Sequence, residues 1–273
     1  MTTGTRIAAT FRGLAAEGRM AFMPFVTAGD PDLDTTLSVI GRLAAAGVDL
    51  IEVGFPYSDP IADGPVIQAS YTRALEAGLT VEAIFERFGE LDREATPPLV
   101  AMVSYAIVFR IGLEAFVARA ATAGFSGMIV PDLPGDEAAD LGRVVRGAGL
   151  DLVQLIAPTT PESRVEAIVA SASGFLYCIA VAGTTGARDA LPEALAGQLA
   201  GLRTRTDLPL AVGFGISRPE HLLALKGQAD GAIVGSALVR RLEPLTDPAA
   251  DAETVLADVG DWVAGLVRTA HQG

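Results

Sequence analysis

Hydrophobic and polar positions divide this chain into two kinds of segment that alternate along its length. Short runs rich in β-branched and other apolar residues are separated by longer stretches in which Ala and Leu recur at helical spacing. The short runs are apolar throughout, which is typical of parallel strands that are covered on both faces. The predicted strands span residues 21–27, 50–54, 99–105, 127–130, 152–156, 175–179, 210–213 and 232–234.

The longer stretches predict eight helices, and one further helix is predicted at the N-terminus. Asp30 and Ser217 place a capping residue at or near a first-turn proline, and Gly47 and Gly147 end helices. The N-terminal helix, over residues 5–17, is expected to cap the bottom of the structure. The other predicted helices span residues 33–46, 81–91, 113–123, 136–147, 161–171, 191–202, 219–226 and 254–269.

Eight strands that alternate with eight helices, without a Ser/Pro-rich linker between them, favour an α/β protein made of a single (β/α)8 TIM barrel over residues 1–273. The length supports this prediction, because such barrels typically have about 250 residues. An open, doubly wound sheet is the alternative. The first strand is not followed by the G-x-G-x-x-G segment that would support that sheet.

The composition narrows the classes of function. The chain has 20 Lys and Arg against 33 Asp and Glu, which gives a formal net charge of -13. An acidic protein without a basic stripe is a poor binder of nucleic-acid phosphates and of anionic membranes. No apolar run reaches the roughly 20 residues that a membrane span needs, and the N-terminus lacks the apolar core of a signal peptide. A cytoplasmic location is therefore expected.

The rarest residue types narrow the chemistry further. Lys226 is the only lysine, Cys178 the only cysteine, and His221 and His271 the only histidines. Lys226 and His221 fall on a predicted helix, and His271 lies in the C-terminal tail. Neither a Schiff-base lysine nor a Ser-His-Asp triad is therefore expected at a strand end. Cys178 is expected to pack in the core, which leaves acid–base chemistry to carboxylates.

Glu52 is the strongest candidate for such a carboxylate. It interrupts the apolar strand over residues 50–54, where a buried charge without a partner is costly. Desolvation would raise its pKa toward neutrality, as a general acid–base group requires. The alternative is a salt bridge to an arginine across the barrel. Asp59 and Asp63 follow in a loop rich in Pro and Gly, where turn formation and capping are the alternative roles. No histidine accompanies them, so a metal site is not expected.

Small residues end the sixth, seventh and eighth predicted strands. In TIM barrels, backbone N–H groups and the start of a short helix bind phosphate at this place. Each glycine pair alone is weak evidence, because any tight turn can use glycine. Together the segments predict a site where an acidic protein holds an anion by its amides. The segments are Gly183-Thr184-Thr185-Gly186, Gly213-Phe214-Gly215 and Gly235-Ser236-Ala237.

Several segments resemble the tryptophan synthase alpha subunit, in order from about residue 11 to residue 242. The longest, EVGFPYSDPIADGPVIQ at residues 52–68, is highly specific. The others lie at residues 24–31, 130–134, 183–188, 213–216 and 235–237.

The resemblance implies a lyase of tryptophan biosynthesis that cleaves indole-3-glycerol phosphate by a retro-aldol reaction into indole and glyceraldehyde 3-phosphate. It makes Glu52 the general acid–base. Asp63 would accept a hydrogen bond from the indole N–H and stabilise the positive charge that develops in the ring. Thr185 matches a mobile-loop threonine that contacts the loop aspartate when the site closes. Matches to the substrate pocket are Phe25, Tyr105, Ile129, Ile156 and Tyr177, and matches to the phosphate site are Gly186, Phe214, Gly215, Gly235 and Ser236.

The resemblance also implies a partner, a beta subunit that carries pyridoxal phosphate and receives the indole for L-tryptophan synthesis. The expected assembly is an alpha2beta2 heterotetramer, with no cofactor in this chain. The segment after Tyr105 lacks one residue of the family pattern, and it helps to form the surface that faces the beta subunit. A stand-alone lyase that releases free indole is therefore the alternative. A catalytically silent regulatory barrel is an alternative of another class, which the intact Glu52 and Asp63 disfavour.

Overall fold

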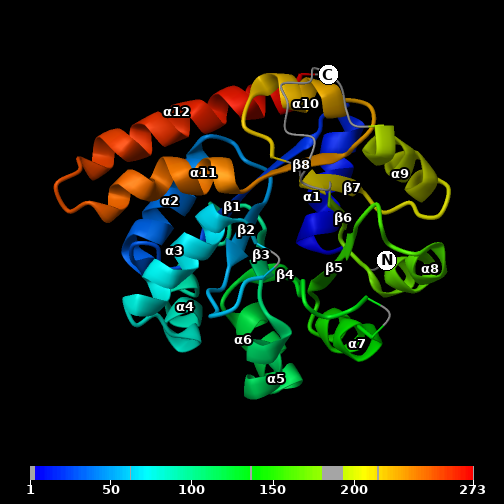
Figure 1. Ribbon diagram of the computed structural model, residues 1–273, viewed down its shortest axis with the longest axis horizontal. Helices are drawn as coiled ribbons and strands as arrows, with labels where there is room; N and C mark the ends of the chain where they lie inside the picture. Colours follow the sequence, from blue (N-terminus) through cyan, green and yellow to red (C-terminus); the bar gives the residue numbers. More distant parts are fainter. Residues whose placement is uncertain (1–3, 62, 136, 180–192, 214, 273) are drawn as a thin grey trace.

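Eight parallel strands close into a barrel in sequence order in the computed structural model, which describes residues 4–61, 63–135, 137–179, 193–213 and 215–272. Helices surround this barrel (Figure 1). The closed barrel confirms the predicted fold, and the open doubly wound alternative is wrong. The strands are β1 (Ala21–Thr27), β2 (Ile51–Gly54), β3 (Leu99–Met102), β4 (Phe125–Ile129), β5 (Asp151–Ile156), β6 (Leu176–Ile179), β7 (Leu210–Gly213) and β8 (Gly231–Val234).

The predicted helices are present, and their ends lie within about one turn of the predicted ends. Among the described residues, no helix combines the length and the apolar character that a membrane crossing requires. The helices are α1 (Arg6–Ala16), α2 (Leu33–Ala45), α4 (Val81–Phe88), α6 (Leu113–Thr122), α7 (Ala139–Gly147), α8 (Glu162–Ser171), α9 (Glu193–Arg203), α10 (Pro219–Leu225) and α12 (Ala252–His271).

Short helices also occur where the hydrophobic pattern does not predict them: α3 (Pro65–Glu76), α5 (Tyr105–Ile111), α11 (Ser236–Leu242) and the 3-10 turn η1 (Glu243–Thr246). Helix α5 replaces the end of the strand predicted over residues 99–105. The Ser104 side chain accepts the Ala106 N–H at 3.2 Å, and the Asp132 carboxylate accepts the Tyr105 N–H at 2.7 Å. These caps start a helix in a segment whose apolar residues alone indicate strand.

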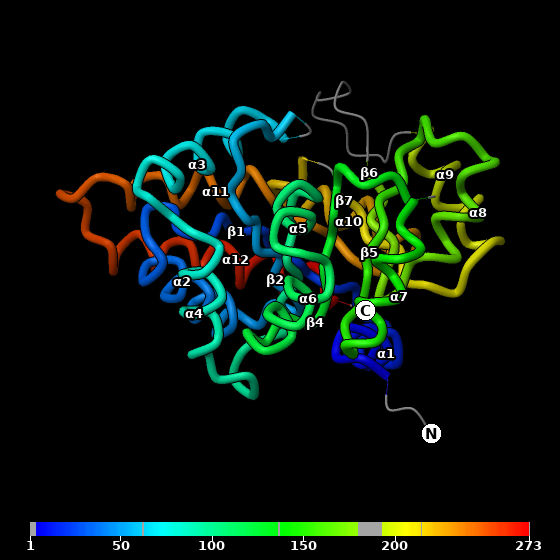
Figure 2. Tube along the Cα trace, turned by 90° about the horizontal axis from the view of Figure 1, so that it is seen from below, coloured from blue at the N-terminus to red at the C-terminus, as the bar shows by residue number. Residues whose placement is uncertain are grey.

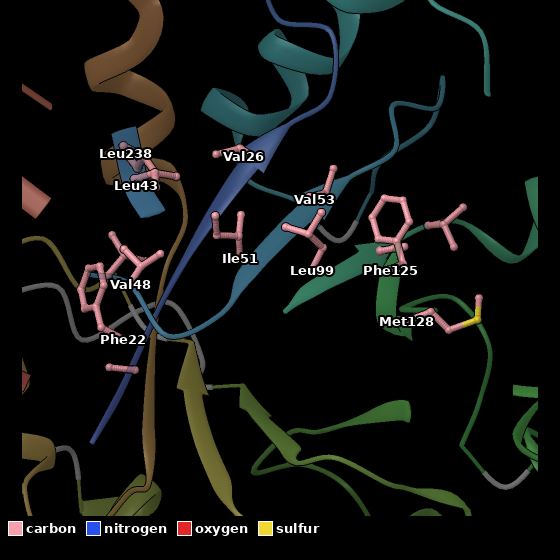
Figure 3. Close-up of a cluster of buried hydrophobic side chains, with 14 of the residues drawn as sticks. Phe22, Val26, Leu43, Val48, Ile51, Val53, Leu99, Phe125, Met128 and Leu238 are labelled. Atoms are coloured by element: carbon pink, nitrogen blue, oxygen red, sulfur yellow. The ribbon is translucent and has the colours of Figure 1, made fainter. Parts of the chain in front are cut away.

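The strands separate two hydrophobic cores, because successive side chains of a strand point to opposite faces. The outer core lies between the strands and the helices, and Figure 3 shows part of it, including Phe22, Val26, Ile51 and Val53. The inner core fills the barrel with side chains from the strands and from residues just before them. These include Met23, Leu50, Val100, Ile129, Val153, Phe175, Ala211 and Ile233, of which Leu50 and Phe175 directly precede β2 and β6.

Helix α1 closes the amino-terminal end of the barrel, as the sequence predicts. Its Ile7 and Phe11 belong to the inner core, and the Phe11 ring centroid lies 5.6 Å from that of Phe175. Gly127 of β4 allows this approach, since a Cβ there would lie 2.8 Å from the Ile7 side chain. Figure 2 shows α1 below the barrel. A ligand therefore has its place at the other end, where the carboxyl ends of the strands meet.

Candidate active site

Glu52 lies on the inner face of β2 and is 1% exposed. Neither of its carboxylate oxygens has a hydrogen-bond partner within the described ranges. Burial therefore raises the pKa of Glu52 from 4.5 to about 8. No arginine of the described residues forms the salt bridge to Glu52 that was the alternative. A carboxyl group in this state is protonated at neutral pH and can both give and take a proton near that pH.

Asp63 lies just before α3, and its charge, like that of Glu52, acts on the hydroxyls of Tyr71 and Tyr177. The loop that holds it is fixed by backbone contacts: the Asp63 N–H donates to the Pro60 carbonyl at 3.0 Å, and the Gln68 side chain donates to the Asp63 carbonyl at 2.8 Å. These bonds leave the carboxylate itself available for a ligand. Asp63 is half-buried, and desolvation raises its pKa above the usual range.

Asp59, in the same loop, has a different environment. It is exposed, its backbone carbonyl accepts the Ile61 N–H at 2.8 Å, and its side chain accepts a bond from the Ser58 hydroxyl at 3.1 Å. These contacts are those of a turn residue. Within the described part of the chain, no group of three or more His, Cys, Asp and Glu side chains is arranged to hold a metal ion.

The structure brings Phe25, Ile129 and Tyr177 together with Glu52 on the inner face. Phe25 of β1 is the direct register partner of Glu52 of β2. Ile129 belongs to the inner core, and Tyr177 packs against it. A Cβ at Gly213 would lie 2.3 Å from the Tyr177 hydroxyl, so this hydroxyl reaches the end of β7. Burial, followed by the charges of Glu52 and Asp63, raises the pKa of Tyr177 well above its usual value.

Two predicted pocket residues lie elsewhere. Ile156 packs in the outer core, whereas its neighbour Leu155 packs against the inner core, and a contact of Ile156 with the substrate stays a prediction. Tyr105 begins α5, and its ring packs against the outer core and lies 6.2 Å from that of Phe109. Cys178 is buried in the outer core, as predicted, and burial raises its pKa to about 12.

The predicted phosphate-site residues lie at the ends of β7 and β8 where they are described. Gly215 has a φ of +39°, which favours glycine, and Ser236 is the first residue of α11. Gly235 lies beside Phe25, whose Cβ would be 3.9 Å from a Cβ at that glycine. Thr185, Gly186 and Phe214 lie outside the described residues.

Tyr71 of α3 is a site residue that the sequence pattern does not reveal. Its side chain is buried, and its ring packs against Phe25 and lies 5.6 Å from the Tyr57 ring. A Cβ at Gly54 would lie 2.5 Å from the Tyr71 hydroxyl oxygen. The glycine at this position was the available signal, since it makes room for a side chain from another element.

A groove of about 890 Å³ adjoins the site on its outer side, between the loop that follows β2 and helix α5. Its lining includes Tyr57, Ile61, Ile107 and Arg110. Ile61 is 91% exposed, and Phe109 on α5 is 76% exposed. Large exposed apolar side chains therefore stand on both elements that border the groove, the loop after β2 and helix α5.

Comparisons with known proteins agree with this geometry. Residues 11–265 match the family model described as tryptophan synthase alpha chain. The tryptophan synthase alpha chain of Rhodopirellula baltica is 46% identical over 270 residues, which cover 96% of this chain and 97% of that protein. The tryptophan synthase of Mycobacterium tuberculosis superposes with a TM-score of 0.88 at 31% identity, covering 99% of this chain and 100% of that one. A chain of the tryptophan synthase complex of Pyrococcus furiosus superposes with a TM-score of 0.79 at 33% identity, and the match covers 90% of this chain and 99% of that one. The chain belongs to the tryptophan synthase alpha chain family.

Proposed function

We propose that this alpha chain cleaves indole-3-glycerol phosphate into indole and glyceraldehyde 3-phosphate with Glu52 as both general acid and general base. The observation that carries this proposal is the burial of Glu52 without a partner for either carboxylate oxygen in the described chain. Such a group is unfavourable for folding, and its raised pKa is what proton transfer at neutral pH requires.

The reaction needs one proton to be given and one to be taken. Neutral Glu52 gives its proton to the indole ring carbon that bears the glyceryl chain. The carboxylate that results removes the proton of the glyceryl hydroxyl next to the ring, and the C–O bond becomes a carbonyl. The C–C bond to the ring breaks, and its electron pair restores the aromatic indole. Glu52 ends as it began, so the reaction consumes no other reactant.

Asp63 supports this step by its charge. Protonation of the ring carbon places positive charge on the indole nitrogen, and a carboxylate that accepts the N–H hydrogen bond stabilises that charge in the transition state. The Asp63 backbone is held by Pro60 and Gln68, so its carboxylate is positioned before substrate binds. Gly215, Gly235 and Ser236 are assigned to the substrate phosphate, together with Gly186 and Phe214 from the sequence-based prediction, and Thr185 is assigned to the mobile loop.

The chain is proposed to act with a beta subunit that docks on the groove between the loop after β2 and α5. This face is apolar, exposed and continuous with the site through Tyr57. Docking here would let indole pass from one subunit to the other. The chemistry of pyridoxal phosphate is assigned to that partner, in an alpha2beta2 assembly. A cytoplasmic location stays a prediction, which cell fractionation tests.

Substitution of Glu52 tests the proposed function. We expect the wild-type chain to release indole and glyceraldehyde 3-phosphate in equal amounts, and Glu52→Gln to lower kcat by about 10²- to 10⁴-fold, because the amide cannot transfer protons. The free energy of unfolding should not decrease, since the carboxylate makes no bonds that the amide would lose.

Near-wild-type turnover by Glu52→Gln would overturn its role. Full activity without any complex with a beta subunit would favour the stand-alone lyase. No cleavage by the wild-type chain, with or without the beta subunit, would favour the silent regulatory barrel.

A further inference from the structure

Tyr71 places a phenol hydroxyl on the inner face of the barrel although its helix, α3, belongs to the outer ring. The side chain is 1% exposed. Gly54 ends β2 and has no side chain, and a Cβ at this residue would lie 2.5 Å from the Tyr71 hydroxyl oxygen. The Tyr71 hydroxyl therefore occupies the space that a side chain at residue 54 would fill. Glu52 and Gly54 face the same side of this strand. The hydroxyl thus lies one inner-face position beyond Glu52, about 6.6 Å along the strand.

The Tyr71 hydroxyl has no hydrogen-bond partner in the chain as far as the structure describes it. Buried hydroxyl groups normally have one, because an unpaired group loses its bonds to water without compensation. Burial raises the pKa of Tyr71 well above its usual value, and the charges of Asp63 and Glu52 add to this effect. The phenol therefore stays protonated at neutral pH and is a neutral hydrogen-bond donor within the electrostatic influence of Asp63 and Glu52.

We propose that Tyr71 is a further catalytic residue, whose hydroxyl donates a hydrogen bond to the glyceryl oxygen from which Glu52 removes the proton. This inference rests on the proposed function. The indole N–H is itself a donor and is assigned to Asp63, and the phosphate is assigned to the ends of β7 and β8. The two glyceryl hydroxyl oxygens remain as acceptors, and the one next to the ring is assigned to Tyr71, because Glu52, on the same face of β2, acts on that oxygen.

This hydrogen bond is catalytic because the glyceryl oxygen gains negative charge only as the reaction proceeds. The glyceryl oxygen gains negative charge while its proton moves to Glu52 and before the carbonyl is complete. A neutral donor already aimed at that oxygen stabilises the transition state more than the ground state. The phenol keeps its own proton throughout, so the balance of the reaction does not change.

Tyr71→Phe tests the proposal, because it removes the hydroxyl and keeps the ring that packs against Phe25. In the full chain, alone and with its beta subunit, we expect kcat to fall about 10- to 100-fold and KM to change less than kcat. The midpoint of thermal unfolding should stay equal or rise, since the hydroxyl has no partner to lose. Ser126→Ala is the matched control: the Ser126 hydroxyl is also buried without a partner among the described residues, but it lies near the start of β4. It should leave kcat unchanged.

A substrate analogue separates hydrogen bonding from a change of pocket shape. The analogue is indole-3-glycerol phosphate with both glyceryl hydroxyls replaced by hydrogen, and it offers Tyr71 no acceptor. Its inhibition constant should be the same for wild type and Tyr71→Phe within about twofold. An unchanged kcat, or a weakening of analogue binding as large as the loss of kcat/KM, would overturn the role of Tyr71. Turnover retained by Glu52→Gln would instead overturn the proposed function itself.

Discussion

Two buried carboxylates on the strands show what distinguishes Glu52. Asp151, at the start of β5, is also buried, and desolvation raises its pKa, but hydrogen bonds from Thr5 and Ser173 oppose that rise. Glu52 has no such compensation. Asp151 lies at the closed end of the barrel, beside α1, whereas Glu52 lies toward the open end. Position and missing partners together, rather than burial alone, identify the acid–base residue.

The raised pKa of Glu52 predicts a pH-dependent stability. Between about pH 5 and pH 8 the folded protein keeps a proton on Glu52 that the unfolded chain has released. The free energy of unfolding therefore decreases as the pH rises through this window, by at most about 1.4 kcal/mol per pH unit from this group. Glu52→Gln removes the contribution, so the variant should gain stability relative to wild type as the pH rises. Urea unfolding of both proteins from pH 5 to pH 8 measures the difference, and parallel curves would contradict it.

Helix α3 is the element that organises the site. It follows the Asp63 loop directly and carries Tyr71, and two polar contacts attach it to β1 and the loop after it. Arg73 makes a bidentate ion pair with Asp30 at 2.8 and 2.7 Å, and the hydroxyls of Thr27 and Ser70 lie 2.7 Å apart. Asp30 is largely buried, so this pair is less screened than one on the surface.

Removing the Arg73–Asp30 pair should therefore affect both stability and turnover. We expect Arg73→Ala to lower the free energy of unfolding by about 1–3 kcal/mol and to lower kcat, because α3 positions Tyr71 and Asp63. Arg143→Ala is the control. Its ion pair with Asp140 is mostly exposed, and its loss should cost less than about 0.5 kcal/mol without an effect on kcat. Equal effects of the two substitutions, measured by denaturant unfolding and steady-state kinetics, would count against this role of α3.

The hydrophobic pattern of the sequence predicts the strands but not helix α3. The eight strands could be predicted because each buried parallel strand is an apolar run. Those runs do not alternate, so they do not reveal which side chains face inward, as the neighbours Leu155 and Ile156 of β5 show. The buried residues of α3 include Ser70 and Ala74, which form no apolar stripe, so the hydrophobic pattern does not predict this helix, and Gly54 alone does not identify Tyr71 as the side chain that fills its space.

At the scale of the whole molecule, the barrel presents two different ends. Helix α1 closes one end, and the other holds the carboxyl groups and the adjoining apolar groove. A net charge of -13 favours holding the substrate phosphate by backbone amides at the open end rather than by a basic patch. The alternation of strands and helices predicts both the closed barrel and the location of its site, and a single domain over residues 1–273 stays a prediction.

The exposed groove predicts how the partner is bound. Phe109→Ser should weaken the complex with the beta subunit about tenfold or more, because it removes a large exposed apolar side chain from α5, the helix that borders the groove. Turnover by the isolated chain should not change. Leu223→Ser is a matched control, since Leu223 is 51% exposed on α10, away from the groove. Titration of each variant with the beta subunit measures both affinities, and equal affinities for the two variants would place the interface elsewhere.

Titration of the Glu52 carboxyl group tests whether Glu52 is the acid of this reaction. Infrared difference spectra of the wild-type chain and Glu52→Gln, recorded across the pH range, isolate the signal of this one group. We predict a protonated carboxyl at pH 7 that ionises with a midpoint near pH 8. A carboxylate that is already ionised at pH 7, with a midpoint near 4.5, would contradict the claim that Glu52 is the acid of this reaction.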